Sequence, residues 1–281
     1  MSLDNKHAST QTLAATLKKQ LINNYKNVKS RISNIEYKII QPEADLSDFV
    51  ERVYIIKNTS SADKEVVLIP DGRIDLFFII TEAEQIIPTL IGIETQPSTA
   101  TYPPNSTFIG VSLKLLSVEY VLHIEIANIL NSAIKLPIKF WDITSTDLND
   151  LELFSKRISS SIRKNIFSNI DQRKQKLFNL IYETNGGLKV KEYAQKVYWT
   201  ERQINRYFNQ TFGLSLKAFC NILRFKASFQ HLKNGKLFPE QNFSDQAHFI
   251  REVKRMTKAT PKELAKNEND RFIQFSTLQT K

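Results

Sequence analysis

The net charge and the pattern of apolar residues both change near residue 150, and this division constrains the fold more than any single motif. Residues 1–150 hold 14 Lys and Arg against 18 Asp and Glu, whereas residues 151–281 hold 25 against 11, so the net charges are −4 and +14. Short runs rich in Val, Ile and Phe fill residues 46–113, a pattern typical of strands. Helical periodicity takes over from about residue 151. The sequence therefore predicts an α+β protein with an acidic, mostly β N-terminal domain and a basic, all-helical C-terminal domain.

Turn residues separate the predicted strands and help to place the domain boundaries. The strands are expected at residues 49–56, 66–69, 74–80, 90–93 and 108–113, with Pro70-Asp71-Gly72 as a tight turn and loops at Pro97-Ser98 and 103–105. Leu13, Leu17, Leu21 and Tyr25 recur at four-residue steps and favour a helix near the start. The expected division is a helical extension over 1–40, a β domain over 41–140, a helical linker over 141–170 and a helical domain over 171–281.

The overall composition excludes several classes of protein. A length of 281 residues suits two domains, and 41% hydrophobic residues is enough for a packed core. No apolar run approaches the ~20 residues of a membrane span. The single cysteine, Cys220, excludes an intrachain disulfide framework. Because no signal-peptide pattern precedes the first domain, we expect a cytoplasmic protein that is not bound to a membrane. The total net charge of +10 permits a nucleic-acid partner without requiring one.

The first candidate recognition helix follows Thr200 in the basic half. Thr200 and Gln203 have the spacing of a capping box, and Gly213 is placed to end the helix in a left-handed conformation. Polar side chains recur on the outer face at helical spacing: Arg202, Asn205, Arg206 and Asn209. Arginine pairs with guanine and asparagine with adenine in the major groove, so this stripe is suited to reading bases. The alternative is an ordinary solvated helix face.

A second unit of the same kind follows about forty residues later in the chain. Phe249, Val253 and Met256 fall on one face of the predicted helix. The opposite face carries Gln246, Ala247, Ile250, Arg251 and Lys254. A strong helix start follows, in which Thr260 caps, Pro261 takes the first position and Glu263 completes a capping box. The repetition of a capped helix with a polar outer face favours the functional interpretation over the solvated face.

These two blocks resemble the DNA-binding domain of AraC-type transcriptional regulators. The first block is Thr200-x-Arg202-x-Ile204-x-Arg206-x-Phe208 with Gly213, Arg224 and Ala227, and the second is Phe243-x-Asp245-Gln246-Ala247-His248-Phe249-x-Arg251-x-x-Lys254 with Thr260-Pro261. The resemblance implies two helix-turn-helix units joined by a long helix, with recognition helices in successive major grooves. The outer-face residues of each unit would then contact bases. The side chains expected to face phosphates are Thr200, Arg224, Lys226 and His248.

The N-terminal half resembles the cupin-like sensor domain of some members of that family. The matching residues are Phe49-Val50-Glu51, the run from Pro70 to Asp75, Gly92 and Gly110-Val111. The resemblance therefore implies a cupin-like β barrel followed by the double helix-turn-helix domain.

The sequence departs from the family pattern at three places. Lys258 stands where the family has glycine, and a left-handed conformation there would cost about 1 kcal/mol. Tyr198 replaces a small residue in the first turn. The segment between Ala227 and Phe243 is about one turn short and contains Pro239, which predicts that the supporting helix of the second unit is reduced to a turn.

The sequence contains no catalytic or metal-binding motif. Its four histidines are His7, His123, His231 and His248, and none lies in the β region, so no cofactor, metal or enzyme activity is expected. Asp71, Arg73 and Asp75 have three interpretations: exposed charges of a hairpin turn, which we favour, a catalytic acidic pair with a cation, or a ligand pocket lined by Arg73 and Asp75. Cys220 is expected to be a buried, inert thiol.

The leading functional hypothesis is a one-component transcriptional regulator that binds specific double-stranded DNA. Its partners would include a small-molecule effector, RNA polymerase if it activates transcription, and a second copy of the chain if it works as a homodimer. One alternative is a cupin-like small-molecule-binding protein or enzyme with a basic nucleic-acid-associating domain. Another is a nonspecific nucleic-acid or RNA-binding protein, which would expect flexible basic tails and exposed aromatics.

Overall fold

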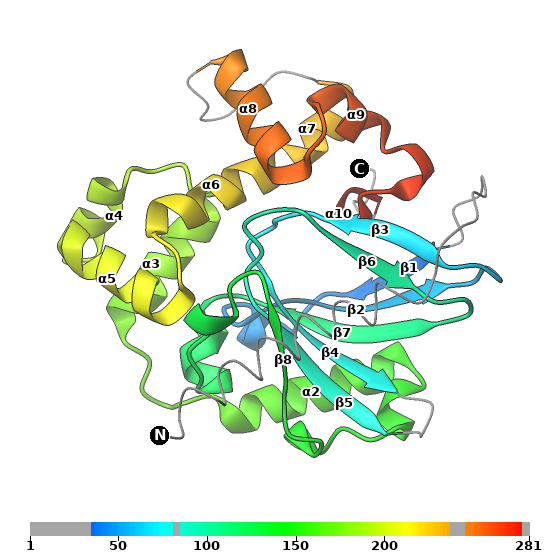
Figure 1. Ribbon diagram of the computed structural model, residues 1–281. Helices are drawn as coiled ribbons and strands as arrows, with labels where there is room; N and C mark the ends of the chain where they lie inside the picture. The colour runs from blue at the N-terminus through cyan, green and yellow to red at the C-terminus, as the bar shows by residue number, and fades with distance from the viewer. Residues whose placement is uncertain (1–34, 81–84, 237–244, 277–281) are drawn as a thin grey trace, which may run out of the picture.

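Two packed sheets form the N-terminal domain. The computed structural model describes residues 35–80, 85–236 and 245–276. The strands in these ranges are β1 (Ile35–Ile40), β2 (Val50–Asn58), β3 (Lys64–Leu68), β4 (Ile74–Ile80), β5 (Ile86–Ile91), β6 (Ser98–Tyr102), β7 (Thr107–Leu113) and β8 (Ala133–Lys135). They form a six-stranded sheet in the order β1-β2-β7-β4-β5-β8 and a two-stranded sheet of β3 and β6, all antiparallel (Figure 1).

Three strands were missed by the sequence analysis. The helical extension expected over 1–40 lies outside the described residues up to residue 34, and beyond it Ile35–Ile40 is a strand that pairs along its whole length with β2. Ser98, predicted in a loop, begins β6, which pairs with β3. β8 lies within the expected β domain but was not predicted as a strand, and its three residues complete the edge of the large sheet beside β5. Each of these strands is fixed by partners distant in sequence.

The connection between the domains is one helix preceded by short turns. Helix α2 (Leu151–Asn165) begins at Asp150, whose carboxylate accepts hydrogen bonds from the backbone amides of Glu152 and Leu153. Its buried face packs on the large sheet, where the Phe154 and Phe78 rings meet edge to face at 5.4 Å. Helix α2 therefore covers only the middle of the helical linker expected over 141–170. The apolar residues 116–130, for which a dimerisation helix and core packing are equally good interpretations from sequence, are mostly buried in the core of the same chain.

The C-terminal domain contains helices in two groups joined by α6 (Leu216–Ala227). The other described helices are α3 (Gln172–Glu183), α4 (Val190–Lys196), α5 (Glu201–Phe212), α7 (Phe229–Lys233), α8 (Gln246–Thr257), α9 (Pro261–Lys266) and α10 (Ile273–Ser276). Figure 1 shows α4 and α5 at one end of α6, with α8 and α9 at the other. The expected α+β fold, a β domain followed by a helical domain, is confirmed. No helix in the described ranges has the length and hydropathy to span a membrane.

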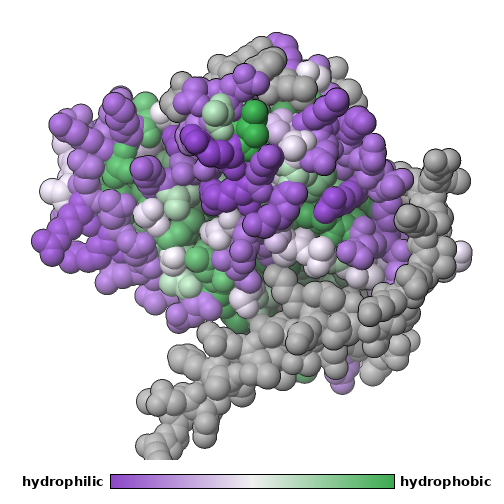
Figure 2. All heavy atoms as spheres, turned by 45° about the horizontal axis from the view of Figure 1, so that its top comes forward, coloured by the Kyte–Doolittle hydropathy of each residue, from purple (hydrophilic) through white to green (hydrophobic). Residues whose placement is uncertain are grey.

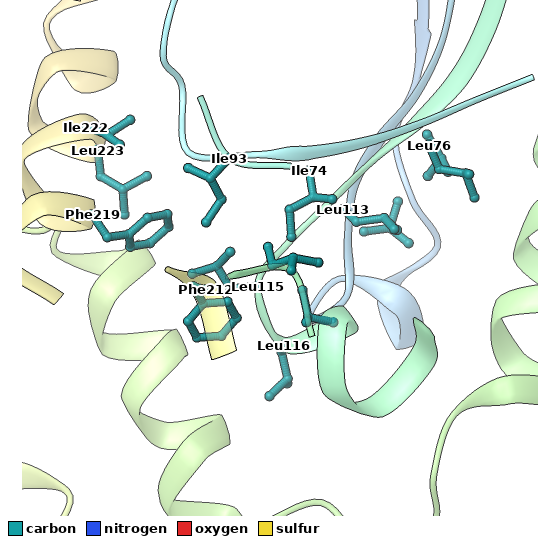
Figure 3. Close-up of a cluster of buried hydrophobic side chains, with 14 of the residues drawn as sticks. Ile74, Leu76, Ile93, Leu113, Leu115, Leu116, Phe212, Phe219, Ile222 and Leu223 are labelled. Carbon is teal, nitrogen blue, oxygen red and sulfur yellow. The ribbon is translucent and has the colours of Figure 1, made fainter. Parts of the chain in front are cut away.

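A single apolar core runs through both domains. Figure 3 shows Leu115 beside Phe212 of α5, and the same buried cluster includes Phe219 of α6 and Ile74 and Leu113 of the sheet. All five side chains are buried. The α6 side chains also approach Gly72, which has φ of 74°, so closely that a Cβ there would lie 2.9 Å from Leu223 Cδ2. The turn at 70–72 is therefore part of the contact between the domains.

The three departures from the family pattern have different outcomes. Lys258 ends α8 in the left-handed region with φ of 57°, and Tyr198 has the same φ and is 85% exposed. Both positions thus require the conformation that glycine adopts without a Cβ penalty. The predicted loss of the supporting helix of the second unit falls on residues 237–244, which lie outside the described residues.

Replacing Lys258 with Gly should raise the free energy of unfolding by about 1 kcal/mol, because glycine removes the Cβ penalty of the left-handed C-cap. Urea denaturation monitored by circular dichroism measures the change. Lys258→Ala is the matched control, since it shortens the side chain but keeps the Cβ and should give no gain. Equal stabilisation by both substitutions would attribute the effect to the side chain instead of the backbone.

Candidate nucleic-acid interface and ligand pocket

Helix α5 presents its polar stripe to solvent. Thr200 Oγ1 accepts from the backbone amide of Gln203 at 3.2 Å, and Gln203 Oε1 accepts from the amide of Thr200 at 2.8 Å. This reciprocal capping box starts the helix as predicted, and Gly213 ends it with φ of 77°. Ile204, Phe208 and Phe212 are buried, while the opposite face carries the exposed Arg202, Arg206 and Asn209 and the half-buried Asn205.

Helix α8 has the same organisation. Asp245 Oδ1 accepts from the backbone amide of His248 at 2.7 Å and caps the helix start. Phe249, Val253 and Met256 are buried. The outer residues comprise the exposed Gln246, Ala247, Arg251 and Lys254 and the half-buried Ile250 and His248. Figure 2 shows hydrophilic side chains gathered over the helical domain on the face that includes the top of Figure 1.

Two of the side chains expected to face phosphates are instead engaged within the protein. Arg224 Nη1 donates to the carbonyl of Gly186 at 2.9 Å, and its Nη2 contacts Asn221 Oδ1. Lys226 Nζ donates to Glu51 Oε1 at 2.6 Å. Both side chains are half-buried and hydrogen-bonded within the protein, so a phosphate contact by either one stays a prediction that would require release of these partners. Thr200 is exposed but serves as the cap of α5.

The inner face of α5 is bonded to the β domain. Tyr207 Oη donates to Glu119 Oε2 at 3.0 Å, and Lys174 Nζ of α3 pairs with the other oxygen of Glu119 at 2.5 Å. The backbone amide of Ile126 donates to the Thr211 carbonyl at 3.1 Å. The candidate recognition helix is therefore directly joined to the domain expected to sense an effector.

A group of four charges, two of them buried and two half-buried, forms a second connection between the domains. Arg73 pairs with Asp71 and with Glu51 Oε1, which lies 3.4 Å from Arg73 Nη1 and also bonds Lys226 of α6. Burial alone would raise the pKa of Glu51, but the adjacent Lys226 and Arg73 lower it to about 2. Arg73 and Asp71 are buried. The favoured interpretation of this turn as exposed charges is therefore wrong, because α6 covers it.

Arg73 and Asp75 also line one pocket, as the ligand interpretation required. The pocket lies between the two sheets and is partly open to solvent, and its empty space with the adjoining solvent amounts to about 610 Å³. Ser112 Oγ donates to Asp75 Oδ1 at 2.6 Å, and burial raises the pKa of Asp75 although Arg73 opposes the shift. A protonated Asp75 can act as a hydrogen-bond donor.

The sequence analysis missed several residues of this pocket. Tyr37, Arg52, Tyr54 and Tyr102 line it, and the Arg52 guanidinium lies 5.5 Å from the Tyr37 ring centre and 5.7 Å from that of Tyr54. Alternate positions along a strand share one face, so Arg52 and Tyr54 in β2 point to the same side. This two-residue alternation in β2 was the sequence signal that could have identified Arg52 and Tyr54 as neighbours in one site. Tyr37 gave none, because its segment was assigned to a helix.

The last described segment of the helical domain closes one side of the pocket. Ile273 and Gln274 are among its lining residues. Gln274 Oε1 accepts from the Ile69 amide at 3.1 Å, and Gln274 Nε2 donates to the Ile69 carbonyl at 3.0 Å. The Val67 amide donates to the Arg271 carbonyl at 2.6 Å, and Phe272 forms a parallel bridge with Val67. This segment thus lies along β3 like a short added strand.

The described residues contain no group of three His, Cys, Asp or Glu side chains that could hold a metal ion. Cys220 is buried as expected, and burial raises the pKa of its thiol to about 12.

Comparison with known proteins gives one family match and several similar structures. Residues 38–135 match a family model described as Domain of unknown function (DUF6597). No curated protein matches the chain. Structures of ToxT, an AraC-family regulator from Vibrio cholerae, are similar at low sequence identity.

Three of these ToxT structures illustrate the extent of the similarity. The P21 form is 15% identical, with 83% of this chain and 98% of that chain covered and a TM-score of 0.38. The unsaturated fatty acid-bound wild type from strain SCE256 is 11% identical, with 85% and 97% covered and a TM-score of 0.38. The complex of the O395 protein with (E)-4-(8-methylnaphthalen-1-yl)but-3-enoic acid is 14% identical, with 83% and 98% covered and a TM-score of 0.39.

Proposed function

We propose that this protein is a sequence-specific DNA-binding transcriptional regulator controlled by a small-molecule effector. The observation that carries the proposal is the repetition of one arrangement at the two ends of α6. Helices α5 and α8 are each capped at the start, buried on one face and lined on the other by exposed Arg, Asn, Gln or Lys side chains.

The two outer stripes have the chemistry of direct base recognition. Arg202 and Arg206 in α5 and Arg251 in α8 are suited to the acceptor pair of guanine, and Asn205, Asn209 and Gln246 to adenine. Ala247 and Ile250 would contact thymine methyl groups. We assign Lys254, Thr200 and His248 to backbone contacts, which position a protein without reading sequence. Arg224 and Lys226 would take part only if their internal partners were released.

Selection of bound sites from random DNA at stated salt tests this proposal. We expect a two-part motif whose halves are centred about one helical turn, or ~34 Å, apart, because each unit would occupy one of two successive major grooves. Binding without sequence preference would instead support a basic domain that associates nonspecifically with nucleic acid. A single short motif would assign base reading to one unit only.

Replacing Arg206 with Ala should weaken specific DNA binding by about 1–3 kcal/mol and relax the preference at one base position. The substitution removes an exposed guanidinium from the middle of the α5 stripe. Fluorescence anisotropy with the selected site and a scrambled site measures the change. Lys156→Ala on α2 is the matched control, since it removes one exposed positive charge outside the interface. Equal losses for both variants would indicate a nonspecific charge effect and would contradict the assignment of Arg206.

The contacts between the domains support effector control. Glu119 and Tyr207 join α5 to the β domain, and Gln274 joins the segment after α9 to a pocket wall. A ligand that changes these contacts would change DNA affinity, and by linkage DNA would change ligand affinity by the same factor. Recruitment of RNA polymerase and assembly as a homodimer are compatible extensions of this role.

A further inference from the structure

The turn before α5 exposes an aromatic side chain at a strained backbone position. Tyr198 lies between α4 and Thr200, the N-cap of α5, has φ of 57° and is 85% exposed. The left-handed conformation is unfavourable for a residue with a Cβ, and a ring left in solvent recovers little of that cost by burial. Strained residues are concentrated at functional sites, so the exposed ring is a candidate contact for a partner.

The two aromatic residues of this turn have different surroundings. Trp199 is half-buried, its backbone amide donates to the Ala194 carbonyl at 3.0 Å, and its ring meets that of Tyr207 in α5 edge to face with 5.7 Å between the centres. Trp199 therefore fixes the turn on the helices that it joins. The Tyr198 ring is held in solvent by a fixed turn and not by a loose end of the chain.

Positive charge surrounds the exposed ring. Lys176 Nζ of α3 lies 5.6 Å from the centre of the Tyr198 ring. Lys196, two residues before Tyr198, is exposed in the last turn of α4. An aromatic face beside two cations is complementary to a polyanion that also offers apolar surface. The sugar–phosphate backbone of DNA has both properties.

The acidic side chains near the turn do not cancel this charge. Asp171 pairs with Arg173 at 2.8 Å. Glu201 occupies the first position of α5, where a carboxylate complements the helix dipole. Three exposed cations accompany it at the turn and the start of α5: Lys176, Lys196 and Arg202. The surface around Tyr198 is therefore positive.

We propose that Tyr198 packs against the sugar–phosphate backbone at the edge of the major groove read by α5. The ring lies against a deoxyribose, its hydroxyl donates to a phosphate, and Lys176 neutralises a neighbouring phosphate. Tyr198 precedes Arg202, the first residue of the α5 stripe, by four positions. A recognition helix that enters the groove therefore brings this turn to the groove edge. This inference rests on the proposed function and adds a contact that positions α5 without reading bases.

Two substitutions at one position separate the ring from the backbone strain. Tyr198→Gly removes both the ring and the Cβ, whereas Tyr198→Ala removes the ring and keeps the Cβ. In fluorescence anisotropy both variants should bind the selected site about fivefold or more weakly than the wild type, with a similar loss on a scrambled site, because the lost contact is to the backbone. Only Tyr198→Gly should raise the midpoint of urea denaturation, by about 0.3–0.5 M. A variant that is more stable but binds more weakly has not lost affinity by unfolding.

Salt dependence separates the ring from its cation. Because Tyr198 carries no charge, Tyr198→Gly should leave the slope of log affinity against log salt unchanged, whereas Lys176→Met should reduce that slope by about 1. Phe167→Ala is the matched control. It removes a ring that is 54% exposed and packs on His123 of the β domain, and it should leave DNA affinity unchanged.

Wild-type DNA affinity in both Tyr198→Gly and Tyr198→Ala would overturn this contact, and a loss confined to the selected site would overturn its assignment to the backbone. An unchanged salt slope in Lys176→Met would overturn the role of Lys176. Each of these results leaves the motif selected by the wild type intact. A wild type that binds DNA without sequence preference would contradict the proposed function instead, and the variants would then be compared on any duplex, since a backbone contact does not depend on sequence.

Discussion

Replacing Glu51 with Gln should lower the free energy of unfolding at pH 7 by about 3 kcal/mol, the lower end of the usual cost of removing one partner from a buried ion pair, because Glu51 and Lys226 are each about a quarter exposed. Glu51 bonds Lys226 and lies beside Arg73, while Asp71 is the other acid in contact with Arg73. Without the Glu51 charge, the buried Arg73 and the half-buried Lys226 share one carboxylate. Urea denaturation followed by circular dichroism measures the loss.

A double-mutant cycle separates the ion pair from simple packing. Glu51→Met and Lys226→Met should each destabilise on their own, because each leaves one charge of the Glu51–Lys226 pair without this partner. Combining Glu51→Met with Lys226→Met removes both charges and should recover most of the stability lost in either single variant. Additive losses in the double variant would contradict direct coupling between the β domain and α6 through this pair.

The same group gives the protein a defined sensitivity to acid. The pKa of Glu51 in the folded protein is about 2, below its ordinary value of 4.5. Because this pKa is depressed, Glu51 takes up its proton at a higher pH in the unfolded state than in the folded protein. The contribution of Glu51 to the free energy of unfolding is therefore complete above about pH 4.5 and disappears as the pH falls toward 2. The difference in stability between the wild type and Glu51→Gln should therefore shrink over this interval. A difference that stays constant from pH 6 to pH 2.5 would contradict the shifted pKa.

Features specified by neighbouring residues were predictable from the sequence. The capping boxes at Thr200 and Thr260 depend on a partner three residues away, and both form as expected. For Lys258 the family pattern left open a costly left-handed conformation or a different turn, and the structure has the left-handed conformation. The polar stripes of α5 and α8 required only helical periodicity, and their base contacts stay predictions.

Features specified by distant partners were not predictable. Lys226 looked like a phosphate contact because its partner Glu51 lies 175 positions earlier in the chain. The turn containing Arg73 looked exposed because nothing local indicates that α6 packs on Gly72. Gln274 gave no signal at all, since its hydrogen bonds reach Ile69 across 205 positions. Such contacts bring the two domains together, so the sequence predicted the elements within each domain better than the contacts between the domains.

Phe219→Ala should produce a loss of about 3–5 kcal/mol in the free energy of unfolding, as expected for an aromatic side chain truncated in a packed core. Phe219 is buried on α6, and its ring lies 6.3 Å from Tyr182 and 6.1 Å from Phe208. Phe167→Ala is the matched control, because that ring is 54% exposed and its loss should cost well under 1 kcal/mol.

The position of Phe219 makes this substitution a test of how the two domains unfold. The ring belongs to the core shared by the sheet and the helical domain, next to Ile93 and Leu223 in Figure 3. We therefore expect the wild type to unfold in one cooperative transition, because neither domain can open without exposing apolar surface of the other. Phe219→Ala weakens this shared contact and should move circular dichroism and tyrosine fluorescence transitions apart. Two separate unfolding transitions in the wild type would contradict a common core. In that case Lys226 could reach DNA without a large rearrangement of the β domain.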